Sequence, residues 1–510
     1  MHIRVHGATL YGIDGVPVSV EVDAGRGLPA FHIVGQGDRV VSESRDRIRA
    51  AFRQCGLEFP PGRVTVNLAP TDIPKAGSAL DLPIAVGIAA TRIELPSETL
   101  SRTLFVGELG LDGGLRPVRG TLPLVAAGHA AGLQQAITAN DSLEEASVCP
   151  EIRTWGARDL AAVVGFVRSG EGLRKGEPAW ECWLGDGEPQ PDLAEVRGQE
   201  SAKRALEIAA AGAHNILLIG PPGSGKTLLS RRLPGLLPEL SFEEALEATR
   251  IHSVAGTLSG HPLVVRPPFR APHHTTSDAG MTGGGRPLRP GEISLAHRGV
   301  LFLDELPEFR RPVLEALRQP LEEGAIRIVR SHAAAEMPAS FQLVAAMNPC
   351  PCGYRGDASR ECRCDEAQVR RYRGKLSGPL LDRIDLHVPV PPVPWRTLAD
   401  EAGAVESTQQ VRERVLRARE LQRRRYSDSP YRVNAELPAH ALRPYAEVAS
   451  DASRLLERAV QQLGLSMRAY VRVLRVARTI ADLDDARGIS APHIAEAISY
   501  RLLDREEPPP

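Results

Sequence analysis

The sequence predicts an α/β fold in which a parallel sheet with flanking helices lies between an α+β region and a helical region. Three observations lead to this prediction. A glycine-rich phosphate loop at residues 220–227 follows an apolar run and precedes a helix-forming run, the strand–loop–helix order of a nucleotide-binding unit. Two more apolar runs, 299–305 and 341–348, end in polar side chains. Residues 405–503 repeat apolar side chains at helical spacing.

The composition is that of an ordinary globular protein. The chain has 510 residues, of which 42% are hydrophobic and 25% charged, and this length predicts roughly three to four domains. No run of about 18 apolar residues occurs, so we expect no transmembrane helix. The first residues lack the apolar stretch of a secretory signal, so we expect a cytoplasmic protein. The net charge of −1 neither favours nor excludes nucleic acid, and any basic surface must be local.

The chain divides into segments of different composition. One segment, rich in Gly, Glu and Pro and without periodicity, predicts a linker. A proline cluster near residue 390 cannot continue a helix or a central strand, which predicts a domain boundary. The predicted segments are an α+β domain at 1–170, a linker at 171–195, a nucleotide-binding domain at 196–393 with a cysteine-rich insertion at 350–364, and a helical domain at 394–505.

Local patterns place the elements within these segments. Alternation of apolar and polar residues predicts strands in the first domain, and runs of helical period predict helices. The strands expected there are 18–22 and 63–68, and the helices are 46–55 and 82–91. The helices expected in the last domain are 408–425, 438–447, 451–463, 468–482 and 491–502.

The phosphate loop predicts the chemistry of the chain. Its glycines let backbone N–H groups turn inward around a polyphosphate. Lys226 reaches the β- and γ-phosphates in such a loop, and the Thr227 hydroxyl binds Mg²⁺. The residues that we expect to hold ATP are Gly220, Pro221, Pro222, Gly223, Ser224, Gly225, Lys226 and Thr227.

Two adjacent carboxylates follow the apolar run that begins at residue 299. Next to the phosphate loop, Asp304 would bind Mg²⁺ and its waters, and Glu305 would act as the base that orients the attacking water. Acidic residues also end strands without any catalytic role. The upstream phosphate loop favours the catalytic interpretation.

Three further polar residues are candidates for the same reaction. Asn348 ends an apolar run and would lie between the phosphate loop and the Asp304 strand, where an amide polarises water or binds the γ-phosphate. Arg383 precedes the last strand and would reach the γ-phosphate of a neighbouring subunit, although a salt-bridged surface arginine is the alternative. Arg468 lies in the first turn of a helix capped by Ser466. Arg472 and Arg475 on that helix are weaker candidates, because a solvated cationic face explains them equally well.

Four of the seven cysteines form two C-x-C pairs within fifteen residues. Four thiolates so close together can surround one tetrahedral Zn²⁺ in a structural role. The C-x-C spacing is tighter than the usual C-x₂-C, and free thiols or a labile disulfide are the alternatives. The candidate ligands are Cys350, Cys352, Cys362 and Cys364. His273 and His274 are interpreted as polar loop residues rather than as ligands.

The sequence gives weaker signals for nucleic acid. Residues 325–332 alternate in polarity and predict a hairpin with Arg327 and Arg330 on its polar side. In a ring of subunits such hairpins would point into the pore and hold phosphates, whereas solvated arginines on an edge hairpin are the alternative. The basic helix at 408–425 would follow a phosphate backbone or serve as a solvated connector. Residues 279–286 are too rich in glycine for regular structure and would form a mobile loop that contacts the substrate or a plain connector.

These motifs resemble a known group. The phosphate loop, 303–305, 347–349 and 380–383 resemble an AAA+ ATPase of the magnesium-chelatase-like branch. The longer stretches 196–199, 269–275, 291–297 and 348–353 resemble the ComM/YifB family, and this resemblance covers nearly the whole chain.

The resemblance implies a function. It implies an ATP- and Mg²⁺-dependent hexameric DNA helicase for branch migration in homologous recombination and natural transformation. It also implies that Arg383 is a finger acting in trans, that Asn348 is the first sensor and that Arg468 is the second. The helical domain would then be a lid over the nucleotide.

The first domain resembles the Lon-protease-like fold. Ser78 falls where Lon-type enzymes carry their nucleophile, but residues 119–124, where those enzymes place a lysine base, contain none. Because an unactivated serine is a weak nucleophile, we expect no proteolysis and assign the domain to assembly or DNA contact. A motor subunit for metal insertion into a tetrapyrrole and an ATP-dependent protease are the alternatives to a DNA motor.

Overall fold

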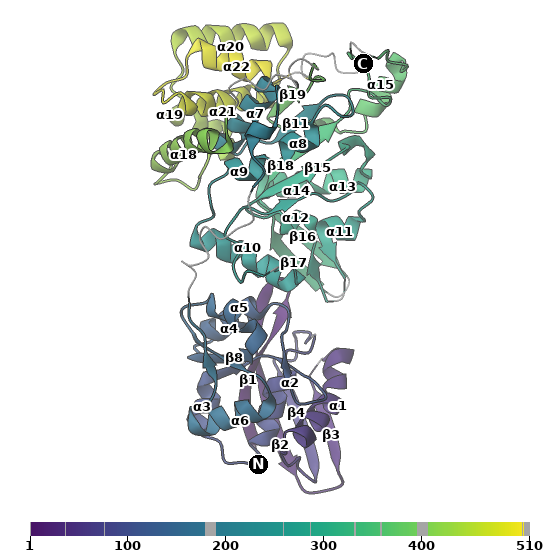
Figure 1. Ribbon diagram of the computed structural model, residues 1–510, viewed down its shortest axis with the longest axis vertical. Coiled ribbons are helices and arrows are strands. Elements are labelled where there is room, and N and C mark those ends of the chain that lie inside the picture. Colours follow the sequence, from purple (N-terminus) through teal and green to yellow (C-terminus); the bar gives the residue numbers. More distant parts are fainter. Residues whose placement is uncertain are drawn as a thin grey trace.

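The structure is a computed structural model with three parts along its longest axis (Figure 1). The N-terminal domain lies at one end, a domain built on a parallel sheet lies in the middle, and the C-terminal helices lie at the other end. The described residues are 2–35, 37–75, 77–178, 190–258, 260–285, 287–330, 333–357, 360–394, 406–501 and 503, without the side chains of 39, 42, 330, 333, 443 and 463.

The N-terminal domain is an eight-stranded mixed sheet in the order β10-β9-β8-β5-β1-β2-β4-β3. Its longest strands, β1 and β2, are antiparallel, with His2 opposite Asp23 at one end and Tyr11 opposite Asp14 at the other. The strands are β1 (His2–Tyr11), β2 (Asp14–Gly25), β3 (Ala30–Val34), β4 (Arg63–Ala69), β5 (Thr103–Phe105), β8 (Gln135–Ala139), β9 (Arg153–Ala157) and β10 (Arg174–Lys175), besides the small pair β6 (Glu108–Leu109) and β7 (Leu115–Arg116). The helices are α1 (Arg39–Gln54), α2 (Asp81–Ala89), α3 (Ser97–Arg102), α4 (Thr121–Ala130), α5 (Leu143–Ser147) and α6 (Leu160–Ser169).

The linker is shorter than the sequence predicts. Strand β10 pairs with β9, so the sheet of the first domain extends past residue 170. At the other side, Leu193 is fully buried in the core of the middle domain. A two-residue strand and a single leucine carry too little periodicity to be found from sequence alone. Residues 179–189 of the predicted linker lie outside the described part.

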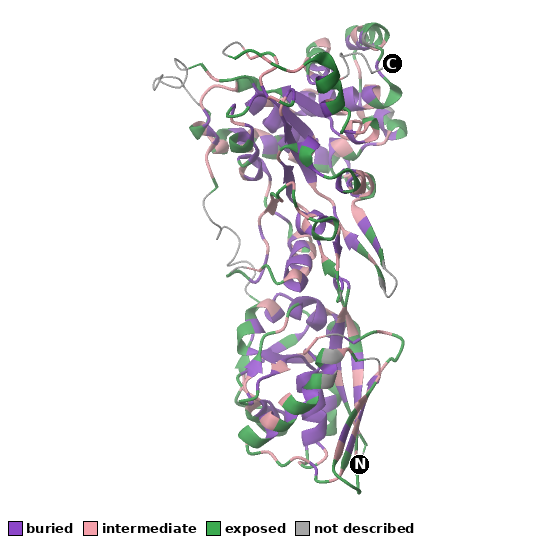
Figure 2. Ribbon diagram, turned by 90° about the vertical axis from the view of Figure 1, so that its right-hand side faces the viewer, coloured by how far each residue is buried: buried purple, intermediate pink, exposed green. Residues whose placement is uncertain are grey.

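The middle domain contains the predicted parallel sheet, in the order β12-β15-β18-β11-β19. The residues of β11, β15 and β18 are buried, as the purple colouring in Figure 2 shows, which explains the continuous apolar runs in the sequence. The strands are β11 (Ile216–Ile219), β12 (Phe269–Arg270), β15 (Val300–Leu303), β18 (Gln342–Met347) and β19 (Leu386–Pro389). The surrounding helices include α7 (Glu200–Gly212), α8 (Lys226–Ser230), α9 (Leu233–Leu236), α10 (Phe242–Ala255), α12 (Glu292–Leu295), α13 (Arg311–Ala316), α14 (Arg318–Glu323), α15 (Glu366–Arg373) and α16 (Gly378–Leu381).

Two small hairpins belong to this domain. The predicted hairpin is formed by β16 (Ala325–Arg330) and β17 (Ala333–Pro338). The glycine-rich segment near residue 280 forms helix α11 (Asp278–Thr282) and a strand β13 (Gly283–Gly284) that pairs with β14 (Arg289–Pro290). The sequence suggested a segment without regular structure, and this interpretation is wrong. Met281 is fully buried there and anchors the helix.

The C-terminal part consists of helices that pack against α7 through one apolar core. Each helix expected from periodicity is present, with ends that differ by a few residues. They are α18 (Thr408–Arg425), α19 (Ala439–Tyr445), α20 (Ser450–Leu463), α21 (Met467–Leu483) and α22 (Ala491–Ser499). The α/β class with a parallel sheet is thus confirmed, while the Lon-type likeness of the first domain and a lid role for these helices remain predictions.

The N-terminal and middle domains share a packed contact between α4 and α10. The buried carboxylate of Glu145 accepts hydrogen bonds from the Ser253 hydroxyl at 2.5 Å and from the Leu122 N–H at 2.8 Å. Burial raises the pKa of Glu145. A second contact joins the domains where the Tyr11 hydroxyl donates to the Ala334 carbonyl at 3.0 Å. The turn between β1 and β2 therefore touches the β16–β17 hairpin.

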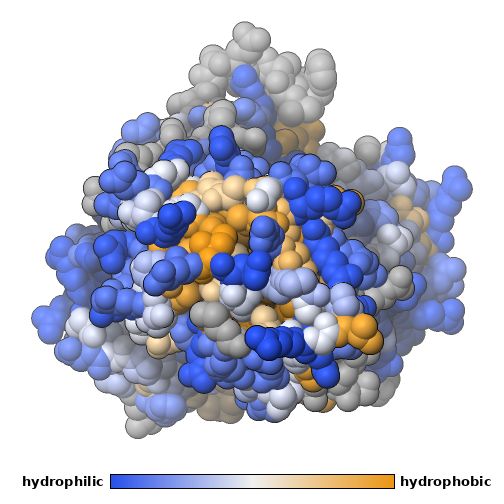
Figure 3. Space-filling view, turned by 90° about the horizontal axis from the view of Figure 1, so that it is seen from below, coloured by the Kyte–Doolittle hydropathy of each residue, from blue (hydrophilic) through white to orange (hydrophobic). Residues whose placement is uncertain are grey.

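The free end of the N-terminal domain carries apolar side chains among polar ones (Figure 3). Large exposed apolar side chains of this domain include Leu28, Val34, Val40 and Leu111. Within the described part of the chain, no helix combines the length and the hydropathy that crossing a bilayer requires.

Candidate active site

The phosphate loop joins the carboxyl end of β11 to helix α8. Gly223 and Gly225 adopt φ of 77° and 95°, a left-handed conformation that favours glycine. Gly220 lies so close to the Val390 carbonyl that a Cβ atom would come within 2.1 Å of the oxygen. The loop therefore requires glycine both for its turn and for close packing.

Lys226 folds back over the loop. Its amino group donates to the carbonyls of Gly220 at 2.8 Å and Pro221 at 2.9 Å, and to the Asn348 side-chain oxygen at 3.2 Å. Burial lowers the pKa of Lys226, and the nearby carboxylates of Asp304 and Glu305 oppose this shift. The amine thus lies at the mouth of the loop, where it can meet a phosphate.

The structure brings the two predicted magnesium ligands together. The Thr227 hydroxyl donates to an Asp304 carboxylate oxygen at 2.7 Å. The other Asp304 oxygen accepts the Glu305 N–H at 2.9 Å. A hydroxyl and a carboxylate are the hard oxygen ligands that Mg²⁺ prefers, and both are open to solvent. These residues fit a magnesium ion that accompanies a nucleotide.

Sheet order explains the position of Asn348. Strand β18 lies between β11 and β15 and ends at Met347. Asn348 therefore emerges between the phosphate loop and Asp304, as predicted, and contacts Lys226. Its role as a sensor stays a prediction.

Glu305 has a neighbour that the sequence analysis did not connect with it. Its backbone is left-handed at φ 51°, which is rare for a non-glycine residue. One carboxylate oxygen lies 3.4 Å from Nδ1 of His274. Because β12 pairs with β15, the loop after β12 passes beside Glu305. No local spacing signals this contact, since the two residues are far apart in the sequence.

Gln199 also supports the loop. Its side-chain amide donates to the Ser224 carbonyl at 3.1 Å and to the Pro391 carbonyl at 2.6 Å. Gln199 thereby ties the phosphate loop to the segment after β19. The sequence singled out this residue by resemblance alone.

Arg383 lies at the opposite edge of the sheet from the phosphate loop. Strands β11 and β19 are parallel, with Ile216 beside Leu386 and Ile219 beside Pro389. Arg383 precedes the amino end of β19, whereas the phosphate loop follows the carboxyl end of β11. Its guanidinium is mostly buried and pairs with Glu322. Arg383 therefore does not face the phosphate loop of its own chain.

Arg468 lies at this same amino edge. It pairs with Asp382 at 3.1 Å, next to Arg383, and remains largely exposed. Arg468 therefore does not face the phosphate loop of its own chain, and its role as a second sensor stays a prediction. Arg472 and Arg475 are not the solvated cationic face that the sequence allows. Arg472 is 8% exposed and lies 3.4 Å from Asp385, and Arg475 donates to the Leu437 carbonyl at 2.6 Å.

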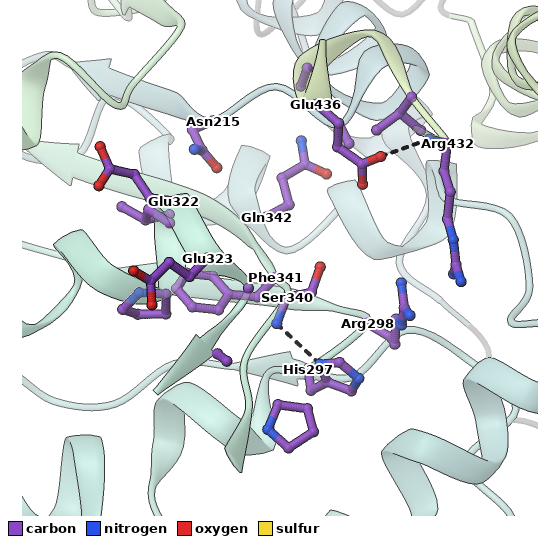
Figure 4. Close-up of a pocket in the computed structure, with 18 of the residues that line it drawn as sticks. Asn215, His297, Arg298, Glu322, Glu323, Ser340, Phe341, Gln342, Arg432 and Glu436 are labelled. Carbon is purple, nitrogen blue, oxygen red and sulfur yellow. Dashed lines mark hydrogen bonds between the residues drawn. The ribbon is translucent and has the colours of Figure 1, made fainter. Parts of the chain in front are cut away.

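A charged cavity of about 1370 Å³ opens at this amino edge. Figure 4 shows Glu322 and Glu323 on one side of it and Arg298 and Arg432 on the other. Its lining also includes Arg383, Arg468, Arg472 and Arg475. The edge that carries the arginines is thus hollow and accessible to another molecule.

The four clustered cysteines converge in space. Sγ of Cys350 lies 3.4 Å from that of Cys352 and 3.6 Å from that of Cys362. Including Cys364, the four sulfurs lie within 4.8 Å of one another. Zn–S bonds of about 2.3 Å in a tetrahedron place sulfurs about 3.8 Å apart. The donor set fits Zn²⁺.

This cysteine cluster (Cys350, Cys352, Cys362 and Cys364) adjoins the nucleotide site. Gly353, the residue after Cys352, packs so closely on Pro222 that a Cβ atom would lie 2.7 Å from the proline ring. A backbone hydrogen bond joins Asn348 to the hydroxyl of Tyr372, whose pKa burial raises to about 12. The segment that carries the cluster therefore packs against the phosphate loop, and α15 contacts Asn348 through Tyr372.

The candidate DNA contacts receive mixed support. Arg327 is exposed on the hairpin and pairs with Glu336 at 2.7 Å. The side chain of Arg330 lies outside the described residues. On the basic helix α18, Arg414 pairs with Glu207 at 2.5 Å and Arg425 with Asp482 at 2.5 Å. These arginines hold α18 to neighbouring elements, so the helix offers much less free charge than its sequence suggests.

In the N-terminal domain, Ser78 has a carboxylate partner. Its hydroxyl donates to Glu108, and the buried amine of Lys75 donates to the Pro70 carbonyl. These contacts give Ser78 no amine base. The absence of proteolysis stays a prediction.

Comparison with known proteins assigns the whole chain to one family. Models of the ChlI subunit of magnesium chelatase match residues 192–398 and 20–142, and a model of the C-terminal part of that subunit matches residues 405–501. An uncharacterized protein of Mycobacterium tuberculosis is 46% identical over 98% of both chains. Competence protein ComM of Haemophilus influenzae and YifB of Escherichia coli are each 44% identical over 98% of this chain and 97% of theirs. The chain therefore belongs to the ComM/YifB family of magnesium-chelatase-like AAA+ proteins.

Proposed function

We propose that this AAA+ protein is an ATP-driven motor that moves DNA branches, acting as a ring of identical chains. One observation carries the proposal. Lys226, Thr227, Asp304 and Asn348 meet at the carboxyl edge of the sheet, whereas Arg383 lies at the amino edge. Arg383 is thus placed to serve the site of an adjoining chain rather than its own, as an arginine finger acting in trans does. Head-to-tail contacts of this kind build a ring when the rotation between neighbouring chains closes.

Each residue has a defined part in hydrolysis. Lys226 and the loop N–H groups hold the β- and γ-phosphates, and Thr227 and Asp304 hold Mg²⁺, which supplies positive charge to the phosphates. Glu305 orients water for attack on the γ-phosphate, and Asn348 contacts the same region. Arg383 of the adjoining chain neutralises the charge that develops on the transferred group.

The DNA part of the proposal has separate support. The Haemophilus relative is named a competence protein, and the family resemblance of the motifs implies branch migration in homologous recombination and natural transformation. The exposed Arg327 on the β16–β17 hairpin offers a phosphate contact once Glu336 releases it. A ring of six chains is the state that the resemblance implies.

The proposal predicts that branched DNA stimulates ATP turnover. A four-way junction at saturating concentration should raise the turnover of the full chain several-fold, because a motor couples hydrolysis to its track. Turnover is measured by phosphate release, with strand exchange on the labelled junction as the second readout. Heparin serves as the polyanion control and should produce no strand exchange. Turnover that no form of DNA changes would contradict the proposal.

A chelatase-type subunit is the second candidate, because the matching models describe magnesium chelatase. The relatives named magnesium-chelatase 67 kDa subunit align less completely, at 28% identity over 38% of this chain for that of Heliobacterium mobile. Stimulation of ATP turnover by four-way junctions would indicate the DNA motor. Stimulation of ATP turnover by a porphyrin-binding partner subunit would indicate the chelatase-type function. Proteolysis is a weaker alternative, since Ser78 pairs with Glu108.

We further propose that the cysteine cluster holds one structural Zn²⁺. The purified chain should contain about one zinc per molecule, and Cys362→Ser should reduce this to near none, because a structural site needs four ligands. Elemental mass spectrometry measures the zinc. Cys55→Ser, which lies outside the cluster, is the matched control and should retain the metal. A wild-type chain that contains no zinc, with the four cysteines oxidised, would refute the assignment.

A further inference from the structure

Within the described residues, the strands of the β16–β17 hairpin pair only with each other. A lone two-stranded hairpin is marginally stable in water, so it needs packing against one of its faces. Burial alternates along β16, where Ile326 and Ile328 are buried and Arg327 and Val329 are exposed. The hairpin thus packs one face inward and turns the face that carries Arg327 toward solvent.

The N-terminal domain supplies part of this packing. Ile13 lies in the turn between β1 and β2 and is 6% exposed. It belongs to the same buried cluster as Ile326 and Ile328 of β16 and Met337 of β17. Its removal would leave a void beneath the hairpin, because the side chains around a lost core residue relax only partly.

Two further contacts hold the same turn against β17. The Tyr11 hydroxyl donates to the Ala334 carbonyl at 3.0 Å. Gly12 has a left-handed φ of 64°, and a Cβ atom on it would lie 3.1 Å from that of Ala335. Figure 1 shows the end of the N-terminal sheet that carries this turn next to β17. The turn therefore touches the hairpin through both its backbone and its side chains.

The hairpin leads directly to the nucleotide site. Three residues separate β17 from β18, and β18 ends next to Asn348. The Ala339 N–H donates to the Gly324 carbonyl at 2.7 Å and closes the base of the hairpin. The middle domain thus fixes the hairpin at its base, and Ile13 of the N-terminal domain supports its inner face.

We propose that the β1–β2 turn is a brace that holds the β16–β17 hairpin in the position from which Arg327 contacts DNA. Ile13 and Tyr11 are positioning residues, because they act on the hairpin and not on the DNA. The DNA part of this inference rests on the proposed function, whereas the brace itself does not. The N-terminal domain thereby acts on DNA through a hairpin of the middle domain.

Hydrogen exchange of the backbone amides in residues 325–338 tests the brace, by mass spectrometry of the full chain without DNA or nucleotide. Ile13→Ala should accelerate exchange there about tenfold or more, because the loss of a large buried side chain shifts a local opening equilibrium at least this far. Tyr11→Phe keeps the ring but removes one hydrogen bond and should accelerate exchange about threefold.

The matched control for these variants is Ile93→Ala. It removes the same atoms as Ile13→Ala from a side chain that packs on a different cluster, the core of the N-terminal domain. Exchange in residues 325–338 should then equal that of the wild type. Thermal unfolding verifies that each variant is folded, and Tyr11→Phe decides the outcome if Ile13→Ala does not fold.

Steady-state ATP turnover at increasing concentrations of a four-way junction tests the consequence for DNA. For Ile13→Ala, the junction concentration that gives half-maximal turnover should rise several-fold, because a smaller fraction of hairpins is then in the binding position. Turnover without DNA should stay near that of the wild type, because Lys226, Thr227 and Asp304 keep their contacts.

Three outcomes separate the brace from the DNA motor. Hairpin exchange that neither Ile13→Ala nor Tyr11→Phe accelerates overturns the brace, as does an equal acceleration in Ile93→Ala. If exchange accelerates as expected but the wild type ignores junction DNA, the brace stands and the DNA motor fails. If the wild type responds to the junction and Ile13→Ala responds at the same concentration, the motor stands and the role of the brace in DNA contact is overturned.

Discussion

Arg383→Ala is expected to lower ATP turnover by about 10³-fold or more, the loss that removal of an arginine finger produces. ATP binding should change little, because Arg383 lies at the amino edge of the sheet and does not face the phosphate loop of its own chain. Turnover is measured by phosphate release and binding by fluorescence of a labelled nucleotide. Arg417 is an exposed arginine on α18, and Arg417→Ala is the matched control. It should leave ATP turnover and ATP binding unchanged.

A mixing experiment tests whether Arg383 acts between chains. Arg383→Ala keeps an intact phosphate loop, and Lys226→Ala keeps an intact arginine. Mixed in equal amounts, the two inactive proteins should regain a measurable fraction of turnover, because some adjoining pairs then combine a complete loop with a complete arginine. The contrary result is a mixture that forms rings, as light scattering measures, but whose turnover is as low as that of each component. It would show that Arg383 does not complete a neighbour's site.

Lys226→Ala is expected to reduce ATP turnover by about 10²-fold to 10³-fold, the cost of removing one group that stabilises transition-state charge. The amine also contacts two loop carbonyls and Asn348, so nucleotide binding should weaken as well. Isothermal titration measures the binding, and phosphate release measures the turnover.

The control for this substitution is an exposed lysine. Lys375→Ala removes an amine that pairs with Glu308 on the surface and should preserve turnover. Both variants should unfold near the wild-type temperature, since the Lys226 amine is buried against polar groups of the loop rather than in an apolar core. A Lys226→Ala protein that hydrolyses ATP normally would place the active site elsewhere.

Much of the nucleotide site was predictable because each of its parts lies in a short sequence motif. The strand–loop–helix around Lys226 follows from glycine spacing and apolar runs, and the strands that end at Asp304 and Asn348 follow from the same patterns. The C-terminal helices follow from their period and, for α21, from the capping residue Ser466. Local propensity and hydrophobic pattern agree at these places.

The sequence-based predictions failed where a contact between distant parts of the chain decides the local structure or the exposure of a side chain. The charge run at 408–425 predicts a helix that follows a phosphate backbone or a solvated connector, but several arginines of α18 instead pair with partners such as Glu207 and Asp482. Glycine content suggested an irregular segment near residue 280, but a buried Met281 anchors α11 there. The partners in both cases come from distant parts of the chain, which periodicity does not reveal.

The sequence alone predicted a phosphate loop, the residues that would hold a nucleotide and its metal ion, and the helices of the C-terminal part. These properties depend on neighbours within a few residues, so spacing and polarity are sufficient. The tertiary structure decided that Asn348 meets Lys226, that His274 faces Glu305, and that Arg383 and Arg468 lie at the edge opposite the phosphate loop. The order and direction of parallel strands set these relations, and they come from packing of segments far apart in the chain.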